Sequence, residues 1–339
     1  MCMIHGGKLR AAADRYGIDE AEWLDLSTGI APWSWPLPPL PAAVWSRLPE
    51  AGDGLIAAAA DYYGCPADRL AALPGSQFAI RELPRLFAPA TVAVPAVGYT
   101  EHAAAWHAAG HRLRCYADLD ALESMLANID RAVVLDPNNP SGERAVSGRL
   151  GRFAAALGPG RLVVDAAFAD CAGGLSFDPF ANDAIVLRSV GKYFGLAGMR
   201  LGFAFGHKPV IEALHGAVEP WGVAHPARWI GARALADRDW QIGQNARIRD
   251  GEAWLRARLA DVFPGHGIAG AGLFVTVFFP AEGAAAAAHE ALARRGVLTR
   301  LGDNGRWLRF GLPLKSQRER LSQALTDMGT HALPIKDSN

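Results

Sequence analysis

The chain has 339 residues, half of them hydrophobic and a fifth charged, so it can bury a sizeable core in one large and one small domain. Its 34 basic and 34 acidic residues balance, which argues against a nucleic-acid partner or an anionic membrane surface. Its cysteines are scattered, without a CxxC pair, and no apolar run reaches the ~18 residues of a membrane span. We therefore expect a cytoplasmic protein without disulfides, zinc or a membrane anchor.

Residues 1–45 are predicted to form an N-terminal arm, because the prolines between Ala31 and Pro41 prevent a long helix. A helix is predicted over Gly54–Tyr63, and short apolar runs then alternate with helical segments. The predicted strands are Thr91–Val94, Arg112–Cys115, Ala132–Leu135, Leu162–Val164, Ala184–Leu187 and Leu201–Phe205. This alternation indicates an α/β domain with a mostly parallel sheet covered on both faces.

The chain from Pro209 to about Phe263 is predicted to be mainly helical, with breaks near Trp221 and Pro226. A strand, a helix, two strands and a helix are then predicted, over Leu273–Phe279, Ala284–Arg295, Val297–Leu301, Trp307–Leu312 and Ser316–Met328. This order indicates a smaller α+β domain. We therefore expect the arm 1–45 to contribute to the active site and the small domain, a large domain over 46–230 and a small C-terminal domain over 231–339.

The segment SVGKYFGLAGMRLG, Ser189 to Gly202, carries the strongest indication of chemistry. Lys192 lies in glycine-rich sequence just after a predicted strand, and burial of an ammonium group depresses its pKa, as a Schiff-base lysine requires. Ser189 and Arg200 flank it and could hold a phosphate through a hydroxyl and a guanidinium. Taken alone, the segment is also compatible with a solvated loop.

Two further segments follow predicted strands. The sequence DPNNPSG begins at Asp136, directly after the strand Ala132–Leu135, and Asp165 ends the apolar run that starts at Leu162. Ligands of open α/β sheets bind at the edge where parallel strands end, so both segments are candidates for a site. By themselves, the first is also typical of an ordinary turn and Asp165 of a helix N-cap.

The order of these three segments resembles fold-type I enzymes that use pyridoxal 5′-phosphate (PLP), the class I/II aminotransferase family. Within that family the sequence is most similar to the histidinol-phosphate aminotransferase-like branch, and the resemblance covers nearly the whole chain. It implies the aspartate-aminotransferase-like α/β fold, with a mostly parallel seven-stranded sheet in the large domain and a small α+β C-terminal domain. It also implies PLP as the cofactor and a homodimer.

The resemblance implies a role for each matching residue. Lys192 would carry PLP as a Schiff base and move a proton, and Asp165 would pair with the pyridine nitrogen. Asn139 would bind the ring hydroxyl oxygen, Tyr99 would stack on the ring, and His102 would support Asp165, unless it is an ordinary core or surface histidine. The cofactor phosphate would be held by Ser189, Arg200 and the backbone amides of Gly75, Ser76 and Gln77.

Arg309, in the strand that begins at Trp307, matches the arginine that grips the substrate α-carboxylate, although a surface ion pair is the alternative. Three positions depart from the family pattern. Phe168 replaces a tyrosine that bonds the ring oxygen, Leu48 replaces a tyrosine that reaches the partner's cofactor phosphate, and Ala31 replaces an asparagine before proline.

The shared motifs do not decide between decarboxylation and transamination. Segments at His5–Gly7, Leu26–Ile30, Pro74–Pro84 and Trp307–Pro313, however, resemble the L-threonine-O-3-phosphate decarboxylase group. That group makes (R)-1-amino-2-propanol O-2-phosphate for cobalamin biosynthesis. The resemblance implies that the phosphorylated amino-acid substrate is bound by His5, Gly6, Gly7, Thr28, Gly29, Asn139 and Arg309. The alternative for residues 5–7 is a flexible tail.

Three other functions remain open: an aminotransferase of the histidinol-phosphate type, a PLP-binding regulator without turnover, and an α/β protein that binds no PLP. The sequence from Gly265 to Gly270 matches GxGxxG, but it lies after a helix and before a strand, so we expect no dinucleotide site there. His102, His107 and His111 lack partners at metal-ligand spacing, so we expect no metal site.

Overall fold

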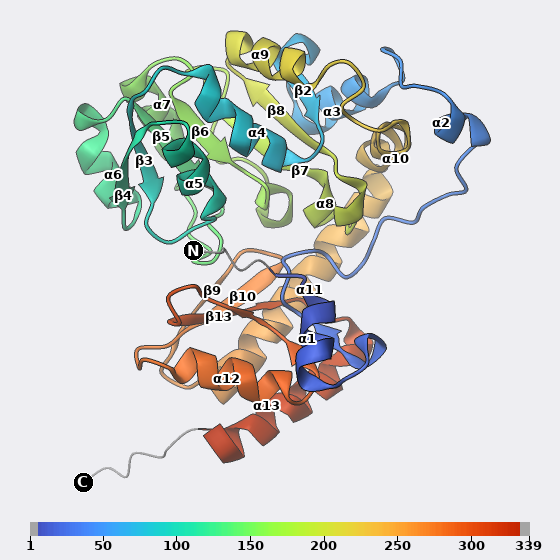
Figure 1. The fold of residues 1–339 in the computed structure, drawn as a ribbon, viewed down its shortest axis with the longest axis vertical. Coiled ribbons are helices and arrows are strands. Elements are labelled where there is room, and N and C mark those ends of the chain that lie inside the picture. Colours follow the sequence, from blue (N-terminus) through green and yellow to red (C-terminus); the bar gives the residue numbers. More distant parts are fainter. Residues whose placement is uncertain (1–5, 333–339) are drawn as a thin grey trace. The chain divides into compact units, whose positions relative to one another are not determined.

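The computed structural model describes residues 6–332, which form two compact units (Figure 1). The unit that we call the large unit comprises residues 34–139 and 143–244. The other, the small unit, comprises residues 6–33, 140–142 and 245–332 of the described chain. The boundary between the two units falls inside a long helix, where the small unit resumes at residue 245. The domain boundary at residue 231 stays a prediction from the sequence.

A seven-stranded sheet forms the centre of the large unit. In spatial order its strands are β2 (Leu70–Leu73), β8 (Gly202–Gly206), β7 (Ile185–Ser189), β6 (Leu162–Asp165), β5 (Arg131–Leu135), β3 (Thr91–Pro95) and β4 (Arg112–Tyr116). β8 pairs antiparallel with both of its neighbours, and all other pairs are parallel. The predicted mostly parallel sheet is therefore confirmed.

Both faces of this sheet are covered. Successive side chains of a strand point to opposite faces, yet every residue of β6 and β8 is buried. Only the edge strand β4 exposes several side chains, among them Arg112 and Arg114. Up to residue 236, the helices of the large unit are α2 (Ala42–Ser46), α3 (Leu55–Tyr63), α4 (Ser76–Glu82), α5 (Glu101–Ala108), α6 (Leu119–Met125), α7 (Arg149–Leu157), α8 (Val190–Tyr193), α9 (Lys208–Val218) and α10 (His225–Ala236).

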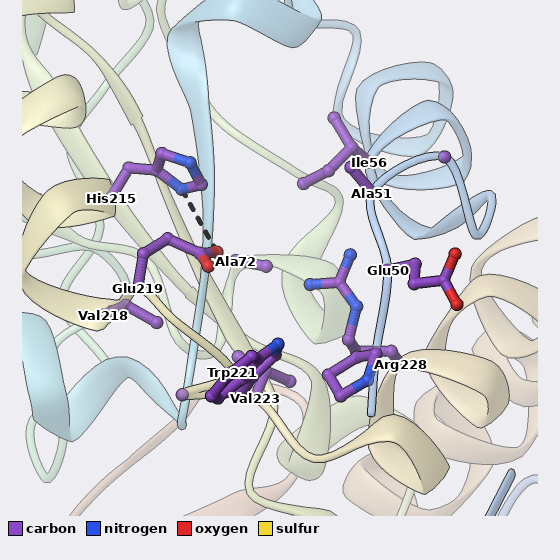
Figure 2. A pocket seen from close by; sticks show the side chains of 13 residues that line it. Glu50, Ala51, Ile56, Ala72, His215, Val218, Glu219, Trp221, Val223 and Arg228 are labelled. Carbon is purple, nitrogen blue, oxygen red and sulfur yellow. Dashed lines mark ion pairs between the residues drawn. The ribbon is translucent and has the colours of Figure 1, made fainter. Parts of the chain in front are cut away.

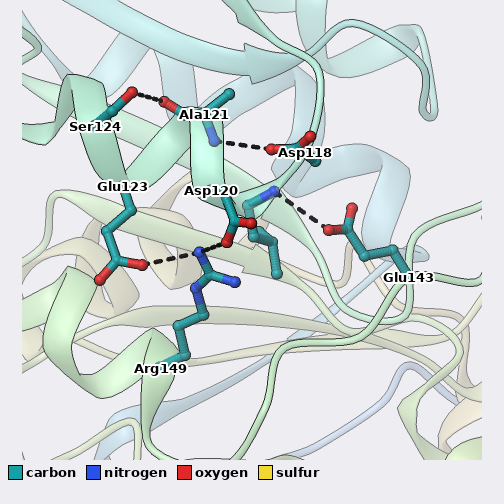
Figure 3. A network of polar contacts seen from close by, with 8 residues as sticks. Asp118, Asp120, Ala121, Glu123, Ser124, Glu143 and Arg149 are labelled. Carbon is teal, nitrogen blue, oxygen red and sulfur yellow. Dashed lines mark hydrogen bonds and ion pairs between the residues drawn. The ribbon is translucent and has the colours of Figure 1, made fainter.

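A polar network ties α6 and α7 to the loop that follows β5 (Figure 3). Asp118 caps α6 by accepting from the Ala121 amide at 2.8 Å, and Arg149 at the start of α7 binds Glu123 of α6 at 2.8 Å. Glu143 accepts from the Leu119 amide at 3.2 Å through its side chain. The loop that contains Asn139 is therefore anchored to α6 just after its exit from the sheet.

The small unit is an α+β layer, as predicted. Its antiparallel sheet has the order β12 (Arg300–Leu301), β13 (Trp307–Gly311), β10 (Phe274–Phe278) and β9 (Gly267–Gly270). A short parallel pair joins β1 (Leu24–Asp25) to β11 (Val297–Leu298). The helices are α1 (Leu9–Tyr16), α12 (Ala284–Ala293), α13 (Arg318–Ala332) and the part of α11 (Arg238–Val262) that lies beyond residue 244.

Several elements differ from the sequence predictions. β2 was not predicted, since Leu70-Ala-Ala-Leu73 has no β-branched or aromatic residue and forms a strand through its pairing with β8. The strand expected over Val297–Leu301 is divided, with β11 and β12 in different sheets. The GxGxxG look-alike forms the edge strand β9. No helix among residues 6–332 is long and apolar enough to cross a membrane.

Candidate active site

The predicted residues of the large unit meet at one edge of its sheet. Asp165 is the last residue of β6, and Ser189 is the last residue of β7. Because β8 runs against its neighbours, its first residue, Gly202, pairs with both Ser189 and Leu73. The turn after β2, the end of β7 and the segment before β8 therefore converge, which places Arg200 and the Gly75 turn side by side.

Gly75 is the contact point between that turn and Arg200. It has φ +80°, and a Cβ built on it would lie 2.6 Å from a terminal nitrogen of Arg200. A Cβ on Gly202 would lie 2.5 Å from the Ser76 amide nitrogen. The backbone of the Gly75–Ser76 turn therefore meets the Arg200 guanidinium close to the end of β7, where Ser189 pairs with Gly202, an arrangement that suits a phosphate.

Asp165 is a buried carboxylate held on both oxygens. Its Oδ2 lies 2.9 Å from Nε2 of His102, and its Oδ1 accepts from the Ala167 amide at 3.1 Å. An ionised carboxylate only accepts, so Nε2 of His102 carries the hydrogen. His102 is 1% exposed, so the structure places it as a buried partner of Asp165 and not on the surface.

Lys192 lies in α8, three residues after the end of β7. Its Nζ is 5.5 Å from the ring centroid of Phe168, which lies three residues after Asp165 in the sequence. Just beyond, Asp170 forms a buried ion pair with Arg188, the residue before Ser189. This pair joins the turn that carries Phe168 to the strand that leads to Lys192.

Asn139 is half-buried in the loop after β5. The neighbouring residue fixes the loop, because the Asn138 side chain donates to the Val97 carbonyl at 2.9 Å and the Asn138 backbone amide donates to the Glu143 carbonyl at 2.8 Å. Tyr99 lies in the turn that leads from β3 into α5, and its hydroxyl donates to Gln77 at 2.9 Å. Asn139, Tyr99 and Gln77 thus belong to the same edge of the sheet as Asp165.

A second group of predicted residues comes together in the small unit. The Gly7 amide donates to Oγ of Ser27 at 2.8 Å, and Arg309 donates to the Ser27 carbonyl at 2.8 Å. A Cβ on Gly6 would lie 2.3 Å from that carbonyl oxygen, so the N-terminal glycines pack directly on the Ser27–Thr28 backbone. Gly29 is buried next to them. His5 lies outside the described residues.

Arg309 is buried in β13 and faces a second arginine. Arg300 of β12 is its register partner, and burial together with Arg300 lowers the pKa of Arg309 to about 10. The Arg300 side chain is 14% exposed and binds Asp303 at 2.9 Å, whereas that carboxylate is 44% exposed. Like charges opposite each other on neighbouring strands are unfavourable, so this pair favours an anionic ligand.

Three residues of these clusters were not predicted from the sequence: Ser27, Glu101 and Arg300. Ser27 links the N-terminal glycines to Arg309, and Glu101 is a buried acid beside Gln77. Arg300 could have been found from the sequence, because it stands in the strand directly before the hairpin that leads to Arg309. Among residues 6–332 no His, Cys, Asp and Glu side chains are grouped as a metal ion would need.

A separate cavity of about 320 Å³ lies in the large unit, between residues 49–52 and the segment that joins α9 to α10 (Figure 2). Figure 2 shows Trp221 and Arg228 at its wall and the ion pair between His215 and Glu219 facing it. None of the described candidate residues lines this cavity.

Comparisons with known proteins decide the family. Residues 52–326 match the model of aminotransferase class I and II. The chain belongs to this family. It is 45% identical to a threonine-phosphate decarboxylase of Pseudomonas aeruginosa, over 91% of this chain and 92% of the relative. It is 40% identical to a threonine-phosphate decarboxylase of a Sinorhizobium species, over 96% of this chain and 98% of the relative.

The fold of this aminotransferase-family chain also matches a solved structure. Histidinol-phosphate aminotransferase from Sinorhizobium meliloti, in complex with pyridoxal-5′-phosphate, superposes with a TM-score of 0.83 at 21% identity, over 97% of this chain and 96% of that one. The aspartate-aminotransferase-like fold predicted from the sequence is therefore confirmed. The family match begins at residue 52, so Gly6, Gly7, Thr28 and Gly29 lie outside the matched residues.

Proposed function

We propose that this protein is a PLP-dependent decarboxylase that converts L-threonine-O-3-phosphate to (R)-1-amino-2-propanol O-2-phosphate. The observation that carries the proposal is the identity of 45% and 40%, over nearly the full length, to two threonine-phosphate decarboxylases. The product assigns the chain to cobalamin biosynthesis. The cluster in which the N-terminal glycines and Ser27 meet Arg309 supports it, because that cluster offers hydrogen-bond donors for an anionic substrate.

The donor set of the large unit fits PLP. Lys192 offers a primary amine that can react with the aldehyde of PLP. Asp165 offers a buried carboxylate, held by His102, that can pair with the protonated ring nitrogen of PLP. The Gly75–Ser76 turn and the Arg200 guanidinium, which we call the phosphate cradle, fit a phosphate. A Cβ on Gly75 would collide with Arg200 and close this site. An amine, a buried acid and a phosphate cradle at one sheet edge are what a phosphorylated pyridine aldehyde needs.

Each residue has a defined task in the reaction. When bound, PLP takes into its ring the electron pair that CO₂ leaves at Cα. Asp165 would keep the proton on the ring nitrogen, Asn139 would bind the ring hydroxyl oxygen, and Tyr99 would support the ring face. Lys192 Nζ would hold the cofactor and, when free, would supply the proton that Cα takes up. Arg200, Ser189 and the amides of Gly75, Ser76 and Gln77 hold the cofactor phosphate.

The small unit supplies the groups that recognise the substrate. Arg309 binds the α-carboxylate through its planar fork. We assign the substrate phosphate to Arg300 together with Thr28, Gly29 and the segment of the N-terminal glycines, with His5 as a further ligand. Two arginines opposite each other suit a substrate that carries both a carboxylate and a phosphate.

The decisive experiment follows CO₂ release and the amine product when PLP-loaded protein is incubated with L-threonine-O-3-phosphate. The matched control is Lys192→Ala. We expect release of CO₂ in the wild type and none in the variant. A protein that binds PLP with a normal visible spectrum but releases no CO₂, and forms a keto product with an acceptor, would instead be an aminotransferase of the histidinol-phosphate type.

We also propose that the chain works as a cytoplasmic homodimer. Large apolar side chains are exposed at Trp45 (70%), Leu48 (59%) and Trp221 (55%), in segments that adjoin the cavity of Figure 2. We assign these exposed apolar side chains to the interface between subunits. Light scattering should give twice the chain mass, and Trp45→Asp should shift it toward one chain, whereas Val146→Asp, at an exposed apolar position before α7, should not.

A further inference from the structure

The first turn of α5 carries two neighbouring polar side chains that reach different elements. Glu101 reaches Gln77 in α4, and His102 reaches Asp165 at the end of β6. Both are buried, with exposed fractions of 6% and 1%. A buried carboxylate is costly unless it is well paired, and the reaction proposed above gives Glu101 no task.

Glu101 determines how the amide of Gln77 is oriented. Gln77 Nε2 lies 2.8 Å from Oε2 of Glu101, and because the carboxylate can only accept, this nitrogen donates. The amide oxygen of Gln77 is then turned to Tyr99, whose hydroxyl donates to it at 2.9 Å. The hydrogen bonds run in one direction, from Tyr99 through Gln77 to Glu101.

This direction also determines what Tyr99 presents to the cofactor. Burial and the nearby charge of Glu101 raise the pKa of Tyr99 to about 12, so its hydroxyl stays protonated and keeps donating. The single hydroxyl proton is taken by Gln77, so Tyr99 offers the cofactor its ring and no hydrogen-bond donor. If Glu101 were absent, the Gln77 amide could turn, and its NH₂ group would then donate to the Tyr99 hydroxyl, which would accept and would no longer donate to Gln77.

We propose that Glu101 is a positioning residue of the cofactor site, which acts through Gln77 to hold Tyr99 in the orientation that supports the PLP ring. This inference rests on the PLP site of the proposed function. Glu101 acts indirectly, through its hydrogen bond to Gln77, and it also lies 3.6 Å from the exposed guanidinium of Arg81. Its effect is therefore on cofactor geometry and not on substrate binding.

The test compares Glu101→Ala with Glu101→Gln, which keeps an acceptor oxygen for Gln77. Loss of one charge-assisted hydrogen bond should weaken PLP binding about tenfold and reduce the visible circular dichroism of bound PLP. At saturating PLP, kcat should fall while KM for the substrate stays within about twofold. Glu101→Gln should recover most of the affinity and the dichroism, because its amide oxygen replaces the carboxylate oxygen.

Arg81→Ala is the matched control. It removes a 69% exposed partner of the same carboxylate, so PLP affinity should stay within about twofold. A second test combines Glu101→Ala with Tyr99→Phe. If both act through Gln77, the combined loss of PLP affinity should be clearly smaller than the product of the single losses.

Several results would overturn the inference. They are unchanged PLP affinity and dichroism in Glu101→Ala, losses that multiply independently in the double variant, and a Glu101→Gln protein as impaired as Glu101→Ala. If Glu101→Ala does not fold, Gln77→Ala interrupts the same series of hydrogen bonds and is held to the same result. A wild-type protein that binds PLP but releases no CO₂ would overturn only the proposed reaction, whereas one without cofactor absorbance would overturn both proposals.

Discussion

His102 and Asp165 form a buried pair, with Nε2 of the histidine 2.9 Å from Oδ2 of the carboxylate. Their side chains are 2% and 7% exposed. Because the Ala167 amide binds the other carboxylate oxygen, both oxygens of Asp165 are oriented from within the protein. A carboxylate held in this way can keep a proton on a ring nitrogen without first reorganising.

Replacement of His102 should therefore lower the rate and leave the cofactor bound. We expect His102→Ala to reduce kcat/KM about tenfold or more, the effect of losing one hydrogen bond to a charged group. His102→Gln should recover part of that loss, because its amide can still donate. The measurement is kcat/KM for CO₂ release at saturating PLP, with the visible spectrum as a check on occupancy.

His111 provides the matched control for this prediction. It is also buried, but its ring nitrogens pair with the Ala90 amide and the Pro84 carbonyl, away from the sheet edge. His111→Ala should lower the melting temperature and leave kcat/KM of the folded protein unchanged. Equal losses of kcat/KM in the two alanine variants would contradict a specific role for His102.

The buried charge of Arg309 should lower the stability of the substrate-free protein while it serves substrate binding. Its pKa, lowered to about 10 from 12.5, means that folding disfavours the charged form. The cost is fully present below pH 10 and disappears as the pH rises from 10 toward 12.5, the ordinary value of an unfolded arginine. The charge therefore reduces stability at neutral pH, and the bound carboxylate of the substrate offsets this.

Arg309→Met should accordingly raise KM for threonine phosphate about 100-fold while the substrate-free protein loses no stability. In the wild type, KM should also rise as the pH passes about 10, where Arg309 loses its proton. Chemical denaturation at pH 7.5 and steady-state kinetics across the alkaline range test the two parts. A strong loss of stability in Arg309→Met would show that the charge is well compensated inside the substrate-free protein.

The large unit and its site could be predicted mainly because its motifs stand where strands end. Asp165, Asn139 and Lys192 each follow an apolar run, and parallel strands bring such positions to one edge. β2 escaped prediction because its two alanines favour a helix, and only the register with β8 makes it a strand. The strand order, and hence the meeting of Gly75 with Arg200, depends on pairing that local sequence does not encode.

The polar partners of the site were harder to predict, for a different reason. Glu101 at the start of a helix is typical of an acid that complements the helix dipole, so its burial against Gln77 left no local signal. Ser27 is an ordinary loop serine until the fold brings Gly7 and Arg309 to it from distant parts of the chain. Contacts of this kind depend on the tertiary structure.

Arg300 should determine the preference for a phosphorylated substrate. Arg300 of β12 is paired with Arg309 on the adjacent strand β13. Its one acidic partner in the described chain is the partly exposed Asp303. We expect Arg300→Gln to raise KM for threonine phosphate at least about tenfold and to change the use of L-threonine little, because threonine has no phosphate to lose. The measurement is the ratio of kcat/KM for the two substrates.

Arg306→Ala is the control for charge removal in the same hairpin, since Arg306 is exposed and binds the Pro280 carbonyl. The substrate ratio should stay as in the wild type for this variant. A parallel loss with both substrates in Arg300→Gln would instead place Arg300 at the carboxylate or in the support of Arg309.

Gly202 should be essential to the phosphate cradle although it offers no side chain. A Cβ there would lie 2.5 Å from the Ser76 nitrogen and 2.8 Å from the Arg188 carbonyl oxygen, and both are backbone atoms that cannot rotate away. Gly202→Ala should therefore displace the Gly75–Ser76 turn, cost about 1–3 kcal/mol of folding free energy and weaken PLP binding.

Gly198 lies four residues earlier in the same segment and supplies the comparison. A Cβ there would meet no heavy atom within 4 Å, so Gly198→Ala should change the folding free energy by less than about 1 kcal/mol, and PLP affinity should not change. PLP titration by visible absorbance, together with denaturation of both variants, separates the two glycines. Equal PLP affinity in Gly202→Ala and Gly198→Ala would mean that the phosphate is held by side chains alone, without the amides of the Gly75–Ser76 turn.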